Sequence, residues 1–313
     1  MRFRIAIALL VCGVGIGAPA ADEVALAAMV ARLDDDSFGV RQRAMAELLK
    51  VGEAAVPTLE ALGESSSPEQ RARAAEVLGE INRRRLERGF GEIGKSSDHE
   101  LDVEQGMILI AQILDPQVTG ESVTAKLDEM AGAVRESLGE GIDPKALGGA
   151  EVVEAITSVL RDQYHLAGDV DNYDHPDNSS IHRVLEKGDG LPIVLSEIAV
   201  AVGRRLGVPL VGVGIPGRYM FMYDGSQAPA GEARENIIVD AFGGWVVKQP
   251  DELEPRWMYD PLRAPRPSLP RETLARMLRN MGSDFLARGD LRRGGELRRY
   301  EALIEGPANA GER

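Results

Sequence analysis

The sequence predicts an α+β fold in which one buried helix is followed by short strands, with further helices on both sides. Residues 192–206 are apolar nearly all round, a pattern typical of a buried helix. After this helix the apolar pattern changes to short runs of β type, interrupted by a loop rich in Gly, Pro and charged residues. The runs cover residues 208–215, 219–223, 236–241 and 245–248, and the loop covers 224–235.

Helical spacing of apolar residues marks further elements before and after this core. Predicted helices cover residues 100–115, 121–139 and 148–164, and a polar loop covers 168–180. The segment 271–304 predicts two helices that are broken at Gly289-Asp290. Polar, Gly-containing residues at 83–99 predict a linker, and so does a Pro-rich stretch at 250–270.

The N-terminal part repeats itself once. Residues 24–50 and 54–82 each predict a helix, a break and a second helix. The four matching positions are offset by 30: Arg41, Arg43, Ala44 and Leu48 recur as Arg71, Arg73, Ala74 and Leu78. This resembles a pair of HEAT-like repeats. A plain pair of helical hairpins remains an alternative.

The charge balance bears on possible partners. The chain of 313 residues has 50 acidic and 36 basic residues, a formal charge of −14. Nucleic-acid binding proteins need a basic surface to displace counterions from phosphates, so no nucleic-acid partner is predicted.

The first 20 residues have the pattern of a secretory signal peptide. Arg2 and Arg4 precede an apolar stretch, and small residues stand before Ala21 at the predicted cleavage site. Cleavage would remove Cys12, the single cysteine, and with it any disulfide, thiolate ligand or cysteine nucleophile. No later stretch has 18 consecutive apolar residues, so no membrane span is predicted after cleavage. We expect an exported protein, periplasmic or secreted; an uncleaved anchor is the alternative.

The middle of the chain contains a series of spaced motifs. They are Gly168-Asp169, Asn172-Tyr173, Pro176, Asn178-Ser179, Val184-Leu185, Gly190-Leu191-Pro192-Ile193, Leu195-Ser196, Arg204-Arg205-Leu206-Gly207, Pro216-Gly217, Val239-Asp240 and Phe242-Gly243-Gly244. In this order they resemble the SirB-type transglutaminase-like family, over residues 100 to 249. Residues 286–290 resemble, more loosely, the tetratricopeptide-like helical pair that follows in that family.

The resemblance implies a papain/transglutaminase-like core, in which the buried helix packs on an antiparallel sheet. In active relatives a Cys begins the helix, a His begins one strand and an Asp lies on the next strand. The corresponding residues of this chain are Pro192, Arg218 and Asp240. Proline offers no nucleophile and arginine stays protonated, so neither can serve in the thiol mechanism.

The altered positions could still bind a ligand. The resemblance would put Arg218 near the helix N-terminus at Pro192, where an anion such as a peptide carboxylate is favoured. Alternatively, Asp240 neutralises Arg218 by pairing with it. Trp245 could wall the same cleft, or lie in the core as an ordinary strand aromatic. The predicted ligand-binding residues are therefore Arg218, Asp240 and Trp245.

A serine mechanism is a separate possibility. Ser196 lies one helical turn after Pro192, and with His182 and Asp240 it could form a Ser-His-Asp set. A serine inside an apolar helix more commonly bonds back to a carbonyl one turn earlier. Glu197 in the same helix is either paired with an arginine or functional.

The polar loop invites a metal hypothesis. Its acidic residues are Asp169, Asp171, Asp174 and Asp177, with His175 among them. The spacing lacks the Gly and the closing Glu of a calcium-binding EF-hand loop, and Asp and Asn are common in turns. No metal and no other cofactor is predicted.

Together these observations predict five segments: a signal peptide (1–20), HEAT-like repeats (21–93), a SirB-type transglutaminase-like domain (94–255), a Pro-rich linker (256–270) and a C-terminal helical pair with its tail (271–313). The predicted function is an exported, non-catalytic module that binds a protein or peptide. One alternative is a serine-dependent hydrolase that uses Ser196. The other is a structural platform on which the HEAT-like repeats do the binding.

Overall fold

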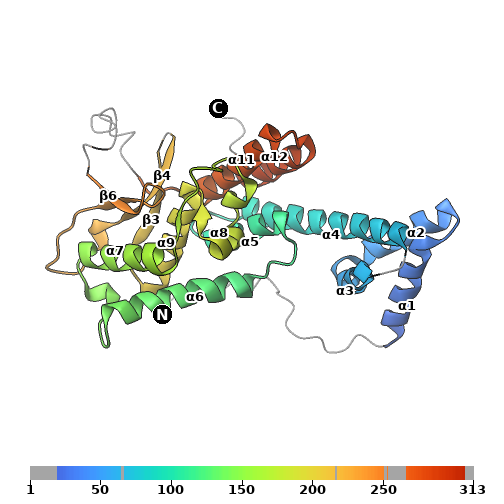
Figure 1. Cartoon of the computed structure of the whole chain (residues 1–313), viewed down its shortest axis with the longest axis horizontal. Coiled ribbons are helices and arrows are strands. Elements are labelled where there is room, and N and C mark those ends of the chain that lie inside the picture. Colours follow the sequence, from blue (N-terminus) through green and yellow to red (C-terminus); the bar gives the residue numbers. More distant parts are fainter. Residues whose placement is uncertain (1–19, 65–66, 216, 250–251, 253–265, 307–313) are drawn as a thin grey trace. The chain divides into compact units, whose positions relative to one another are not determined.

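The computed structural model describes residues 20–64, 67–215, 217–249, 252 and 266–306 (Figure 1). The chain divides into two compact units, residues 1–85 and 86–313. Residues 1–19 of the predicted signal peptide, with Cys12, lie outside the described residues, and so does most of the predicted linker at 256–270. Both therefore remain predictions.

The first unit is helical. Its helices are α1 (Ala20–Ala31), α2 (Phe38–Val51), α3 (Val56–Glu60) and the first part of α4 (Pro68–Lys95), joined by 3₁₀ turns. Leu33, Leu48 and Leu59 lie at the centre of its own core. The repeated positions Ala44 and Ala74 are both buried, which agrees with two similar helical pairs. That these pairs are HEAT-like remains a prediction.

The linker predicted at 83–99 is wrong over most of its length, because α4 continues as helix to Lys95. Leu86 and Phe90 lie four residues apart on one face of this helix and are buried in the core of the second unit. Phe90 stacks on Tyr300, with 4.9 Å between the ring centroids. The polar residues that suggested a linker instead surround this narrow apolar stripe.

Apart from α8, the helices that follow α4 in the second unit have the predicted order. They are α5 (Val103–Leu114), α6 (Gly120–Leu138), α7 (Gly149–Ser158), α8 (Ile181–Lys187), α9 (Pro192–Leu206), α11 (Pro270–Ala287) and α12 (Leu291–Glu305). The break at Gly289-Asp290 is confirmed, since Gly289 adopts φ 79° and Asp290 caps α12 by accepting a hydrogen bond from the Arg293 N–H. Helix α8 was not predicted, because its seven residues are too few to show a helical period.

The predicted strands are confirmed as one antiparallel sheet. The strands β3 (Leu210–Ile215), β4 (Arg218–Tyr223), β5 (Ile237–Asp240) and β6 (Val246–Lys248) lie in the order β3-β4-β5-β6. Each strand pairs antiparallel with the next. A separate parallel pair joins β1 (Ala167–Gly168) to β2 (Asp189–Gly190). β1 lies at the start of the stretch predicted as a polar loop.

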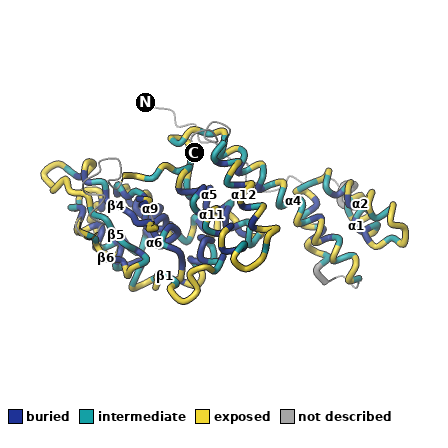
Figure 2. Tube along the Cα trace, turned by 90° about the horizontal axis from the view of Figure 1, so that it is seen from above, coloured by how far each residue is buried: buried dark blue, intermediate teal, exposed yellow. Residues whose placement is uncertain are grey.

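Helix α9 packs on β3 and β4, as expected for the buried helix. Most of its residues are buried, and Figure 2 shows this concentration of buried residues around α9 and the sheet. Gly203 lies against the Leu210 side chain, so a larger residue there would separate the helix from the strand. Gly207 ends the helix with φ 71°, a left-handed conformation that favours glycine. The second unit is therefore a mixed, helix-rich fold with a small sheet.

None of the described helices is long and apolar enough to cross a membrane.

Candidate functional site

The candidate site lies at the start of α9. Pro192 occupies the first turn of the helix, where its missing N–H costs no hydrogen bond. Leu191 precedes it in an extended conformation and donates its N–H to the Asn178 carbonyl over 3.0 Å. The helix thus begins with a side chain that cannot attack a carbonyl carbon.

The polar loop before α8 is held against this helix start. Asn178 is fully buried; it donates to Asp169 Oδ2 over 3.1 Å and to the Asn172 carbonyl over 2.7 Å. Lys187 Nζ donates to Asn178 Oδ1 over 2.6 Å. Burial raises the pKa of Asp169, but hydrogen bonds from Asn172 and Asn178 outweigh this and hold the pKa below its ordinary value. These motif residues have a structural role.

The metal hypothesis for this loop finds no geometric support. The Asp169 carboxylate accepts hydrogen bonds from the Asn172 N–H and the Asn178 side chain. His175 Nδ1 accepts the Asp177 N–H over 3.3 Å. Within the part of the chain that the structure describes, no three His, Cys, Asp or Glu side chains gather as metal ligands would. The loop uses its polar side chains to form turns.

Arg218 is the first residue of β4 and lies opposite Ile215. It is exposed, and its side chain forms no hydrogen bond or ion pair with any residue that the structure describes. Its carbonyl accepts a hydrogen bond of 2.8 Å from Arg276, whose guanidinium also lies over the Tyr219 ring. Arg218 therefore presents a positive charge at the end of the sheet where β4 begins.

The expected ion pair between Asp240 and Arg218 is not found among the described residues. Asp240 ends β5, and its Oδ1 instead accepts the Gly243 N–H over 2.9 Å. The carboxylate closes the turn between β5 and β6, in which Gly244 has φ 93°. The geometry follows from the short connection, which brings the Gly243 N–H within reach of the Asp240 carboxylate.

Trp245 lies in the core and does not wall a cleft. Only 4% of it is exposed, and its indole N–H donates to the Leu166 carbonyl over 2.7 Å. Its ring lies 6.2 Å from that of Phe221. Of the two roles considered from the sequence, the structure supports that of a core aromatic.

The structure does not assemble a Ser-His-Asp set from the predicted residues. Ser196 is completely buried, and its Oγ has no hydrogen-bond partner in the described chain, not even the carbonyl one turn earlier. His182 lies on α8 with Nε2 3.4 Å from Glu186 Oε1, and Asp240 is bonded to Gly243. No described hydrogen bond links any two of the three residues.

Glu197 is paired, but with a tyrosine and not with an arginine. Tyr219 donates to Glu197 Oε1 over 2.7 Å and lies 2.9 Å from Thr273 Oγ1, so the cluster joins α9, β4 and α11. Burial raises the pKa of Glu197 to about 7, although the hydrogen bond from Tyr219 and the charge of Arg204 lower it. The sequence signal for this cluster was a single Glu in an apolar helix. Its partner could not be predicted, because Tyr219 meets Glu197 only through the packing of β4 on α9.

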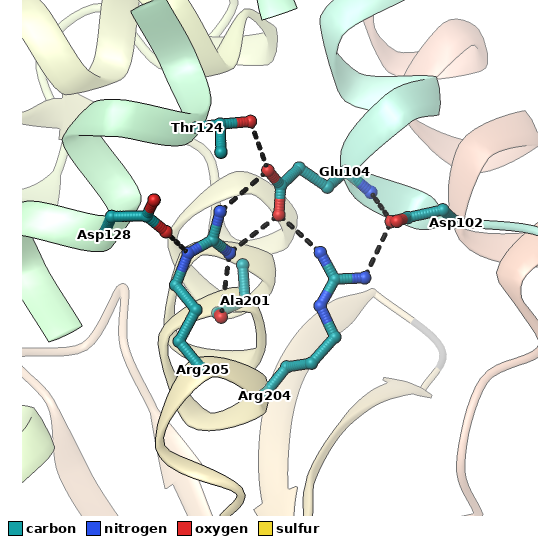
Figure 3. Close-up of polar contacts among 7 residues, drawn as sticks. All are labelled: Asp102, Glu104, Thr124, Asp128, Ala201, Arg204 and Arg205. Atoms are coloured by element: carbon teal, nitrogen blue, oxygen red, sulfur yellow. Dashed lines mark hydrogen bonds and ion pairs between the residues drawn. The ribbon is translucent and has the colours of Figure 1, made fainter. Parts of the chain in front are cut away.

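The motif Arg204-Arg205 has a structural role, shown in Figure 3. Both guanidinium groups bind Glu104 of α5, which is only 4% exposed, and Arg205 bonds it through two nitrogens at 2.7 and 2.9 Å. Arg204 also binds Asp102, and Arg205 also binds Asp128 of α6. Burial raises the pKa of Glu104, but hydrogen bonds from Arg205 and Thr124 outweigh it and lower the pKa. The network ties α5 and α6 to the end of α9.

Several known proteins resemble part of the chain. F-box only protein 21 of Mus musculus is 34% identical over 95 residues, 30% of this chain and 15% of that protein. The UPF0162 protein of Xylella fastidiosa is 32% identical over 102 residues, 33% of this chain and 34% of that protein. The UPF0162 protein of Vibrio cholerae is 24% identical over 149 residues, 48% and 51% of the two chains. No solved structure matches.

A family model also matches part of the chain. The model described as the transglutaminase-like superfamily matches residues 121–279, from α6 into α11. This range includes α9, the whole four-stranded sheet and all three positions at the altered site. The narrower SirB-type, HEAT-like and tetratricopeptide-like assignments remain predictions. Because the match covers just over half of the 313 residues, the chain belongs to the transglutaminase-like superfamily.

Proposed function

We propose that this protein is an exported member of the transglutaminase-like superfamily that binds a protein or peptide and does not catalyse thiol chemistry. One observation carries the proposal: α9 begins with Pro192, and the single cysteine, Cys12, lies outside the matched region 121–279. Thiol catalysis needs a thiolate together with a base that takes up its proton. Neither group stands at the corresponding positions of this chain.

Arg218, at the start of β4, supports a binding role. Its exposed guanidinium has no partner among the described residues, while the neighbouring Arg276 is committed to the carbonyls of Arg218 and Ile215. A planar guanidinium suits bidentate recognition of a carboxylate. The ligand class that we propose is a peptide with a free carboxylate.

The test compares peptides that differ only in this carboxylate. A panel of fluorescein-labelled hexapeptides, each made with a free and with an amidated C-terminus, is titrated with the full chain, and binding is followed by fluorescence polarisation. We expect tighter binding of the free acids and at least a tenfold loss in Arg218→Glu. Arg298→Glu is the matched control, because Arg298 is also exposed and has no described partner. Equal binding of acids and amides would contradict the carboxylate site.

The serine-hydrolase alternative is tested separately. The full chain is incubated with a fluorophosphonate probe beside Ser196→Ala. We expect no labelling, because Ser196 is completely buried and its hydroxyl contacts no described base. Labelling that disappears in Ser196→Ala would replace the binding proposal with a hydrolase.

Export is proposed from residues 1–20 alone. Expression of the full chain in a Gram-negative host, followed by fractionation and N-terminal sequencing, tests it. A mature protein that begins at Ala21 outside the cytoplasm is expected. A cytoplasmic protein that retains residues 1–20 would contradict export without affecting the binding proposal.

A further inference from the structure

Strand β6 is the last strand of the sheet among the residues that the structure describes. In the order β3-β4-β5-β6 it pairs with β5 on one side only, and no described residue pairs with its other side. The opposite edge, β3, is covered by the chain itself. There Ser268 donates its N–H to the Gly212 carbonyl over 2.8 Å, and Val213 forms an antiparallel bridge with Pro267. One edge of this sheet thus already accepts an extended segment.

Strand β6 presents apolar side chains. Val246 is 47% exposed and Val247 is 41% exposed, although Val247 lies opposite Val239, which is fully buried. Edge strands of soluble proteins are usually blunted by charge, proline or a covering segment, because unpaired backbone groups recruit other strands. In β6 one of the three residues, Lys248, is charged and the other two are valines. Exposed valines at both positions leave apolar surface that an added strand would cover.

An aromatic pair extends this surface at the turn before β6. The Tyr173 ring, in a residue that is 45% exposed, meets Phe242 edge-on at 5.5 Å between centroids. Phe242 in turn packs on Gly168, and Gly168 is paired with Gly190 just before α9. Strand β6 and the start of α9 therefore belong to one continuous region.

We propose that β6 binds an extended apolar segment of a partner protein, which adds to the sheet as a further strand. The proposal rests on the proposed function in assuming a protein partner, and it names the surface and the kind of segment. Main-chain hydrogen bonds to β6 would supply affinity, and side chains beside the valines would supply specificity. We call Val246, Val247 and Lys248 the edge site.

The charge of Lys248 favours an acidic residue in the bound segment. Lys248 lies opposite Ile238, on the face of the sheet that Val246 and Asp240 share, and has no ion pair with a described residue. An acidic side chain on the added strand, beside Lys248, would complement it, and such cross-strand pairs of opposite charge stabilise sheets. The segment we propose therefore alternates apolar residues with at least one Asp or Glu.

A second copy of this chain fits the edge poorly. Stable protein dimers bury about 800 Å² on each partner. Pairing two edges of three residues each would bury far less. A flexible segment of another protein meets no such size requirement, because it can wrap further over the aromatic pair.

The test exchanges charges across the contact. Two fluorescein-labelled hexapeptides with amidated C-termini are used, Thr-Val-Glu-Val-Thr-Val and the same peptide with Lys in place of Glu. We expect the full chain to bind the Glu peptide at least fivefold more tightly, and Lys248→Glu to reverse this preference. Val247→Asp should weaken both peptides about tenfold. Val24→Asp, at a valine that is 70% exposed in the other unit, is the matched control.

Unchanged preference in Lys248→Glu, or equal binding by Val247→Asp and the wild type, would overturn the edge site. Self-association in sedimentation that Val247→Asp abolishes would also overturn it, in favour of a second copy. The amidated peptides separate this inference from the proposed function. If Arg218→Glu loses the free acids while the edge variants bind as the wild type does, the carboxylate site stands and the edge site fails.

Discussion

Replacing Glu197 by Gln tests the buried cluster of Glu197, Tyr219 and Thr273 most directly. In the folded protein burial raises the pKa of Glu197 to about 7, whereas its ordinary value is 4.5. At about 1.4 kcal/mol for each pH unit, this difference corresponds to about 3 kcal/mol. Glutamine has nearly the same shape and still accepts the hydrogen bond from Tyr219, but it cannot ionise.

The sign follows from proton binding. Between pH 4.5 and about 7 the folded protein keeps the Glu197 proton and the unfolded chain has released it. Unfolding therefore releases a proton in this window, so the Glu197 contribution to stability falls as the pH rises and is constant above it. The Gln variant lacks this contribution. Its free energy of unfolding, relative to the wild type, should rise by most of about 3 kcal/mol between pH 5 and pH 8.

Urea unfolding of both proteins, followed by circular dichroism at several pH values, measures this difference. A constant offset between the curves reports only the fit of the amide group, whereas the change with pH reports ionisation. A difference that stays within about 0.5 kcal/mol over the whole range, against the expected 3 kcal/mol, would refute the assignment of a neutral buried acid. Glu121→Gln, at an exposed residue of α6, serves as the control for the substitution itself.

Three further predictions, one of them with a control variant on the same helix, are tested in the second unit by urea unfolding. Arg205→Ala removes two bonds from buried Glu104 and should cost about 3 kcal/mol; a cost below about 1 kcal/mol would mean that the network is dispensable. Gly94→Ala would drive a methyl group into a backbone carbonyl of α12 and should destabilise the protein by about 1–3 kcal/mol. Gly91→Ala, on the same helix, places a methyl group where no atom lies nearby and should stabilise the protein slightly. Equal effects of the two variants would contradict the close approach of α4 to α12 at Gly94. Asp284→Asn removes a buried carboxyl whose pKa is raised to about 6 by burial and by the charge of Asp174. The variant should therefore gain stability relative to the wild type as the pH rises from 4 to 7, and a parallel pH profile would contradict this.

Local sequence patterns were sufficient to place most elements. Residues 192–206 were predicted as a buried helix and form α9 with the same bounds, because a helix that is apolar nearly all round is stable only when it is buried. The strands and the break before α12 followed from period and turn residues in the same way. Two helical segments were not predicted. Helix α8 is too short to show a helical period. In the C-terminal part of α4 the single apolar stripe lies among many charged residues.

The sequence by itself also determined what the altered site lacks. A proline at 192 and an arginine at 218 exclude a thiolate and a base at those positions whatever the packing, because these side chains do not have the chemistry. The resemblance drawn from ordered motifs agrees with the family match over residues 121–279 at the level of the transglutaminase-like superfamily, and the SirB type remains a prediction.

Only the tertiary structure decided which side chains meet. Asp240 bonds Gly243 and not Arg218, Glu197 bonds Tyr219, and Trp245 enters the core. Each outcome depends on strand register and helix packing, which join residues far apart in the chain. The position of β6 at the end of the described sheet has the same origin, because a sequence can predict a strand but only the folded sheet determines its neighbours.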